Sequence, residues 1–234
     1  MNRESKSGAM EGFKAGLPVF VGYFPVAVAF GILAKTIGLS AGDSLSFSVM
    51  VFAGASQFMA LNLIKTGVAF GGIIFTTFLL NLRHLLMSAS LAAKIKGQNR
   101  RWLPLVAFGV TDETFAVAAT YPKSIGVLFL LALEGTAYLG WVSGTLCGYL
   151  AGGVLPGSLR ESMGIGLYAL FVAILVPGLK KSGFIAALAL GSGLIHMLLN
   201  WIKLWPGSWN LAAAIIVSSL LGAWLIPSRR EESA

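Results

Sequence analysis

The chain has 234 residues, of which 56% are hydrophobic and only 11% are charged. Soluble domains carry about 25% charged residues, so this composition indicates an integral membrane protein and leaves no stretch for a soluble domain. The formal net charge is +8. Most basic residues fall in short gaps between apolar runs, where they orient the chain and contact lipid headgroups, so nucleic acid is a poor explanation for them.

The polar N-terminal stretch carries Arg3, Lys6 and Lys14 and leads into an apolar run that continues to Ala34. No clean small-residue cleavage site followed by a mature domain interrupts this run, so we predict a retained first helix. The single cysteine, Cys147, permits no intramolecular disulfide, and we interpret it as a small residue that packs between helices.

Apolar segments about long enough to cross a bilayer recur along the chain and predict an all-α, polytopic helix bundle forming one membrane domain over 1–234. The predicted segments are 16–34, 44–64, 68–91, 104–119, 126–150, 163–176, 183–201 and 211–226.

The distribution of basic residues bears on how many of the eight segments cross. If all of them cross, the basic cluster at 94–101 lies outside and the charge bias nearly vanishes. If segments 44–64 and 163–176 are instead discontinuous helices that enter and return, twelve basic residues lie inside and four outside. The positive-inside rule favours this second arrangement, with both termini in the cytoplasm.

The only two histidines have similar surroundings: Leu82-Arg83-His84-Leu85-Leu86-Met87 resembles Leu194-Ile195-His196-Met197-Leu198-Leu199. Each lies in the third segment of a four-segment half. This match predicts two inverted repeats, 16–120 and 126–226, a plan found in secondary transporters. A chance match in leucine-rich sequence is the alternative.

Segment 104–119 contains Thr111, Asp112 and Glu113 in the middle of an apolar run. A carboxylate in hydrocarbon costs roughly 2.5 to 3.5 kcal/mol on insertion scales, so an adjacent pair indicates a polar site inside the bundle. Such acids suit a proton carrier. The alternative is an ion pair with Arg83 that only joins two helices.

Two further groups of residues are candidates for the same site. Arg83 can neutralise an acid or bind a substrate carboxylate, beside Asn81, and His84 can carry protons. In Gly54-Ala55-Ser56-Gln57, an unwound helix would offer N–H groups to a carboxylate and carbonyls to an ammonium. The alternatives are an interfacial arginine for the first group and a small-residue packing face for the second.

Enzyme signatures are lacking: the sequence contains no HExxH, GxSxG or Walker loop, and no Cys/His metal set. We therefore expect no catalytic activity and no cofactor. A structural subunit whose partner forms the path, and an intramembrane enzyme that uses the same acids and His84, remain as alternatives. Glu134 lies in segment 126–150, and the sequence leaves open whether it is interior or interfacial.

Three motifs in this order and spacing resemble the AzlC family: the GASQF motif at 54–58, NLRH at 81–84 and TDE at 111–113, followed by the region 135–144. The resemblance covers 16–176. It implies a permease of the bacterial inner membrane that exports valine, leucine, isoleucine or analogues, beside a small hydrophobic AzlD-type subunit. Oligomeric state is left open.

The motifs and the physical argument together predict one site in a permease domain that spans the chain. Some of its residues are expected to bind substrate and others to carry protons. The expected substrate-binding residues are Gly54, Ala55, Ser56, Gln57, Asn81, Arg83 and Thr111, and the expected proton-coupling residues are Asp112, Glu113 and His84.

Overall fold

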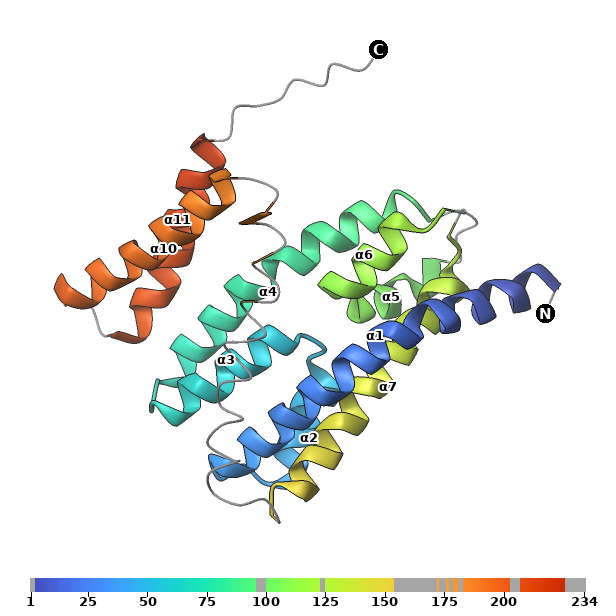
Figure 1. Ribbon diagram of the computed structural model, residues 1–234, viewed down its shortest axis with the longest axis horizontal. Helices are drawn as coiled ribbons and strands as arrows, with labels where there is room; N and C mark the ends of the chain where they lie inside the picture. The colour runs from blue at the N-terminus through green and yellow to red at the C-terminus, as the bar shows by residue number, and fades with distance from the viewer. Residues whose placement is uncertain are drawn as a thin grey trace. The chain divides into compact units, whose positions relative to one another are not determined.

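The structure is a computed structural model that describes residues 3–95, 100–122, 125–153, 172, 176, 179–180, 183–202 and 207–225 (Figure 1). Throughout these ranges the regular elements are helices, which confirms the all-α class. The chain divides into two compact units. Unit 1 is Met1–Asn62 with Leu80–Leu170, and unit 2 is Leu63–Leu79 with Phe171–Ala234. The division into halves 16–120 and 126–226 stays a prediction.

Unit 1 is built on two long helices, α1 (Arg3–Thr36) and α7 (Val127–Ala151), which pack side by side (Figure 1). Gly144 and Gly148, four residues apart on α7, face the backbone of α1. A Cβ on Gly148 would lie 2.0 Å from the carbonyl oxygen of Val28. Small residues at this spacing let two membrane helices approach closely, so glycine is required here.

The predicted segment 44–64 consists of two helices, α2 (Ala41–Met50) and α3 (Gly54–Lys65), separated by residues 51–53. The predicted discontinuity in this segment is therefore confirmed. Its position differs from the expectation, because the unwound stretch precedes the glycine-containing patch. Residues 54–57 form the first turn of α3.

Aromatic contacts with α1 give the direction in which α3 runs. Phe52, in the break, has its ring centroid 5.9 Å from that of Tyr23. Phe58, on α3, lies 5.5 Å from Phe30, which is seven residues further along α1. The chain thus enters from the C-terminal end of α1 through α2 and turns back toward the same end through α3.

Helix α4 (Phe70–Ala92) begins in unit 2 and continues into unit 1. Within the described ranges, residues Gly8–Thr36 of α1, α4 and α7 are each long and apolar enough to cross a membrane. Cys147 on α7 is exposed, so it is not the helix-packing residue that its apolar surroundings predicted.

Segment 104–119 is not one crossing helix: it forms α5 (Leu103–Gly109), preceded by the short η1 (Arg100–Trp102), and α6 (Asp112–Thr120). The axes of α5 and α6 are bent by 114°. Lys94, just after α4, donates to the carbonyl oxygen of Ala119 at 3.4 Å, so α6 returns to the end where α5 begins. The segment is therefore a bent helix pair and not the single continuous helix that its apolar run predicted, and its crossing stays a prediction.

The break between α5 and α6 has a local cause. Thr111 is the N-cap of α6: its side chain accepts a hydrogen bond from the backbone N–H of Thr114, and the Thr114 side chain accepts one from the backbone N–H of Thr111. This reciprocal arrangement satisfies the N–H groups of a new helix start. Asp112 and Glu113 in the first turn add a favourable interaction with the helix dipole.

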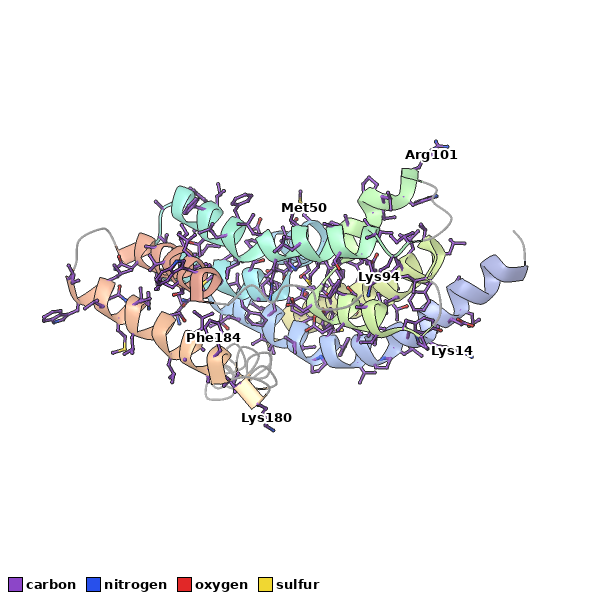
Figure 2. The ribbon with its side chains drawn as sticks, turned by 90° about the horizontal axis from the view of Figure 1, so that it is seen from above. Lys14, Met50, Lys94, Arg101, Lys180 and Phe184 are labelled. Carbon is purple, nitrogen blue, oxygen red and sulfur yellow. The ribbon has the colours of Figure 1, made fainter. Side chains whose placement is uncertain are left out.

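Basic residues mark one end of unit 1. Figure 2 shows Lys14, Lys94 and Arg101 toward the same end, where α1 begins and α4 ends. Lys35 lies near the opposite end of α1 and donates to the carbonyl oxygen of Tyr149, in the last turn of α7, at 3.0 Å. This placement agrees with the expectation that the N-terminus and the 94–101 cluster share a side.

In unit 2, helices α10 (Gly183–Ile202) and α11 (Gly207–Leu225) pack together (Figure 1). Asn210 donates to Asn200 Oδ1 at 2.7 Å, and Asn200 Nδ2 lies 3.3 Å from His196 Nε2. His196 therefore has a structural partner. The predicted segment 163–176 lies outside the described residues except for 172 and 176, so the eight-segment count and the inverted repeats stay predictions.

Candidate functional site

Tyr23 of α1 lies where the two broken helices meet. Its hydroxyl donates to Glu113 Oε2 at 2.5 Å and lies 2.7 Å from Thr111 Oγ1. Its ring contacts Phe52 edge-on and Trp141 of α7 edge-on, at centroid distances of 5.9 and 5.4 Å. We call this region the junction. It comprises Tyr23, Trp141, the breaks at 51–53 and 110–111, the first turns of α3 and α6, and residues 81–84 of α4.

An ion pair links α4 to α6 in the junction. Arg83 Nη1 lies 2.6 Å from Asp112 Oδ2, and the two side chains are 38% and 33% exposed. Asp112 and Glu113 thus have different partners, as their divergent directions on a helix predict. The pairing that was the structural alternative for these acids is present, and it lies beside the polar groups of both helix starts.

Gln57 closes the gap between α2 and α3. Its Nε2 donates to the carbonyl oxygens of Phe47 and Val51, and its Oε1 accepts from Trp141 Nε1 at 2.9 Å. Only 1% of the side chain is exposed. Gly54 is equally constrained, because a Cβ there would lie 2.5 Å from the Trp141 ring. In this conformation the first turn of α3 is covered by Trp141.

Ser56 and Asn81 connect α3 to α4. Asn81 Nδ2 donates to Ser56 Oγ at 3.2 Å, and Ser56 donates to the carbonyl oxygen of Ala53 at 2.9 Å. Ala55 is buried next to them, and His84 is half-buried on α4 beside Arg83. All ten predicted site residues therefore lie in the first turns of α3 and α6, at the α6 cap or at 81–84 of α4.

Two buried polar atoms of the junction have no hydrogen-bond partner in the described part of the chain. They are Asn81 Oδ1, an acceptor, and Arg83 Nε, a donor. Buried polar atoms are nearly always paired with protein, water or ligand, so the unpaired acceptor and the unpaired donor each require a partner.

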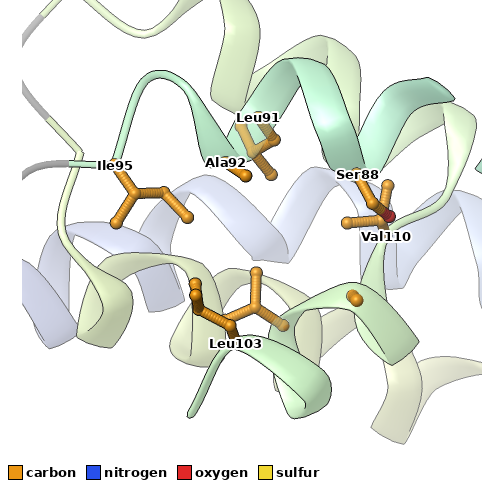
Figure 3. A pocket seen from close by; sticks show the side chains of 8 residues that line it. Ser88, Leu91, Ala92, Ile95, Leu103 and Val110 are labelled. Carbon is orange, nitrogen blue, oxygen red and sulfur yellow. The ribbon is translucent and has the colours of Figure 1, made fainter. Parts of the chain in front are cut away.

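An apolar pocket of about 200 Å³ lies between α4 and α5, close to the second break (Figure 3). Leu91, Ile95, Leu103 and Val110 line it together with Ser88 and three other residues. Because Val110 directly precedes Thr111, the pocket supplies apolar volume next to the polar groups of the junction.

Sequence reasoning missed Tyr23 and the junction role of Trp141. A tyrosine in an apolar run between Pro18 and Pro25 was the available signal, since intramembrane proline and polar side chains often accompany irregular backbone. Glu134, whose depth in the membrane the sequence left open, is buried within unit 1: it is 3% exposed.

The architecture defines a polytopic, all-helical integral membrane protein with a polar junction of two broken helices. A family model described as AzlC protein matches residues 18–155, more than half of the chain. The chain belongs to the AzlC family, which confirms the resemblance seen in its motifs.

Curated relatives match over most of their length. A membrane protein of Archaeoglobus fulgidus is 36% identical over 96% of this chain and 99% of its own. Inner membrane protein YgaZ of Escherichia coli K12 is 32% identical over 74% of each chain. The branched-chain amino acid transport protein AzlC of Bacillus subtilis is 29% identical over 77% of this chain and 72% of its own. No solved structure matches.

Proposed function

We propose that this chain is a secondary transporter that exports branched-chain amino acids across the bacterial inner membrane, with coupling to protons. Two lines support the proposal. The Bacillus subtilis relative is named a branched-chain amino acid transport protein. The junction offers complementary polar groups in a chain whose long helices are suited to a membrane.

The observation that carries the proposal is the unpaired donor and acceptor on α4. An amino acid zwitterion needs hydrogen-bond donors for its carboxylate and acceptors for its ammonium. Arg83 Nε is an unpaired donor and Asn81 Oδ1 an unpaired acceptor. The apolar pocket at Val110 suits an aliphatic side chain.

Asp112 and Glu113 would couple transport to the movement of protons. Asp112 is paired with Arg83, and Glu113 accepts a hydrogen bond from Tyr23. A substrate carboxylate competes with Asp112 for Arg83, and release of Asp112 leaves it free to bind a proton. His84, half-buried beside Arg83, is a second proton carrier in this proposal. A small AzlD-type subunit would complete the transporter, and both termini would lie in the cytoplasm.

Proteoliposomes test the proposal. Vesicles that contain this chain, alone and with the small subunit, should take up labelled valine or leucine, and a pH gradient should change the rate. The double variant Asp112→Asn, Glu113→Gln should lose the response to the gradient.

Lys35→Gln is the matched control, because Lys35 is charged and part-buried but lies at the end of α1 against Tyr149, outside the junction. It should transport as the unaltered chain does. Equal gradient-driven flux in the double variant would remove the acids from the mechanism. Absence of flux with both subunits present would exclude the proposed function.

A further inference from the structure

Glu134 is a buried acid outside the junction. It lies on α7 with 3% of its surface exposed, and its Oε2 atom has no hydrogen-bond partner among the described residues. No charged side chain in the same part of the structure lies close enough to compensate it. An ionisable group in this position inside a membrane helix is a functional candidate by default.

The carboxyl group of Glu134 rests on the last residue of α5. A Cβ on Gly109 would lie 2.5 Å from Glu134 Oε2, so only glycine permits this contact. Gly109 is followed by Val110 and Thr111, where the backbone leaves α5 and bends by 114° into α6. The acid therefore touches the helix pair at its hinge, two residues from the cap that positions Asp112 and Glu113.

A pocket of about 280 Å³ opens beside this contact. From α5 it is lined by Leu105, Phe108 and Gly109, none of which is ionisable, and from α7 by Glu134 and Tyr138 with two other residues. Tyr138 is the only other titratable group there, and its hydroxyl donates to the carbonyl oxygen of Val49 at 2.9 Å. The pocket leaves empty volume beside the carboxyl group.

We infer that Glu134 is a proton-binding site whose occupancy is linked to the α5–α6 hinge. The closed contact with Gly109 fits the neutral carboxylic acid, because an uncompensated negative charge is unstable in a buried apolar setting. When α5 moves away and water enters the pocket, the Glu134 O–H bond breaks and the proton passes to water. Reprotonation allows the contact to close. The role of this proton in coupling to transport rests on the function proposed above.

Infrared difference spectroscopy of the full chain in lipid tests proton binding without any transport. A pH titration should show a protonated carboxyl band that is absent in Glu134→Gln and unchanged in the control Asp43→Asn, an exposed acid at the start of α2. Gly109→Ala should weaken the band at the same pH, because the added methyl group prevents the closed contact. If Gly109→Ala does not fold, Glu134→Asp, one methylene shorter, should move the band to a different pH.

A band of equal intensity in Glu134→Gln, or a titration unaffected by both Gly109→Ala and Glu134→Asp, would overturn the inference. Transport then tests the coupling step. Glu134→Gln should still exchange valine at equilibrium, but the flux driven by a pH gradient should fall at least tenfold. If the unaltered chain transports and Glu134→Gln responds equally to the gradient, the coupling role fails while the proposed function stands. If the unaltered chain does not transport, the proposed function and the coupling role fail, and the infrared result alone decides proton binding.

Discussion

Tyr23 joins the two broken helices through one hydroxyl group and one ring. The hydroxyl contacts Glu113 and Thr111 at the start of α6, and the ring contacts Phe52 in the other break. The ring and the hydroxyl group of Tyr23 therefore contribute to the site in different ways. The ring fills space between helices, whereas the hydroxyl fixes the carboxylate of Glu113.

Tyr23→Phe should leave the fold intact and impair transport. The variant keeps the ring contacts and removes a hydrogen bond to a charged group, which contributes about 1.5–3 kcal/mol. Thermal unfolding and valine flux are measured together. Tyr149→Phe is the control, since its hydroxyl donates to the carbonyl oxygen of Leu39 outside the junction. Equal flux in both variants would show that the Tyr23 hydroxyl has no role in transport.

The pair of Arg83 and Asp112 should show energetic coupling. Contacting residues typically couple by about 0.5–3 kcal/mol. In a double-mutant cycle with Arg83→Gln and Asp112→Asn, unfolding in detergent should show that the double variant loses less stability than the sum of the single variants. Additive losses would mean that the 2.6 Å contact contributes nothing to stability.

At the scale of elements, the sequence indicated one helix break and missed the other. The distribution of basic residues predicted a discontinuity in segment 44–64, and the small and polar residues at 54–57 were its expected position, although the break itself lies at 51–53. The break at Val110 and Thr111 follows Gly109, the last residue of α5. A new helix starts here because Thr111 and Thr114 form a capping box. In the sequence alone, the same polar residues are equally consistent with a polar site inside one continuous helix. The sequence alone therefore did not separate a continuous helix from a bent pair, whereas the contact of Lys94 with Ala119 shows that α6 returns toward the end of α4.

Because α1 and α7 pack closely, two glycine substitutions on α7 should change the stability of the protein differently. Gly148→Ala should destabilise the protein by about 1–3 kcal/mol, because the new Cβ would lie 2.0 Å from Val28 O. Gly135→Ala, on the same helix, meets nothing within 4 Å and should be neutral or stabilise by up to about 1 kcal/mol through helix propensity. Thermal unfolding measures both. Equal effects would contradict the packing of α1 on α7.

At the scale of the whole molecule, the membrane class and most helix positions follow from the sequence, because long apolar runs permit few other structures. The contacts that assemble the site do not follow from the sequence. Asn81, Arg83, Ser56 and Asp112 were each predicted, but the pairing of Arg83 with Asp112 and of Asn81 with Ser56 depends on two helix pairs that enter from opposite ends of unit 1. Tyr23 has no motif of its own.

The charge distribution predicts the orientation of unit 1. Lys94 and Ala41 are both exposed and lie at opposite ends of it. In a background with Cys147→Ser, a cysteine at Ala41 should react with an impermeant thiol reagent added to intact cells. A cysteine at Lys94 should react only after permeabilisation. The reverse pattern, or labelling of both from one side, would contradict the proposed cytoplasmic N-terminus.

Leucine binding to the junction is the most direct test of the transport proposal. Equilibrium binding of labelled leucine is measured on the purified chain and its small subunit. Asn81→Ala removes the unpaired acceptor and should weaken binding at least tenfold, about 1.4 kcal/mol. Asn200→Ala, in unit 2 outside the junction, should bind as the unaltered chain does. Absence of saturable binding, or equal affinity in Asn81→Ala, would contradict the proposal that the junction holds the substrate.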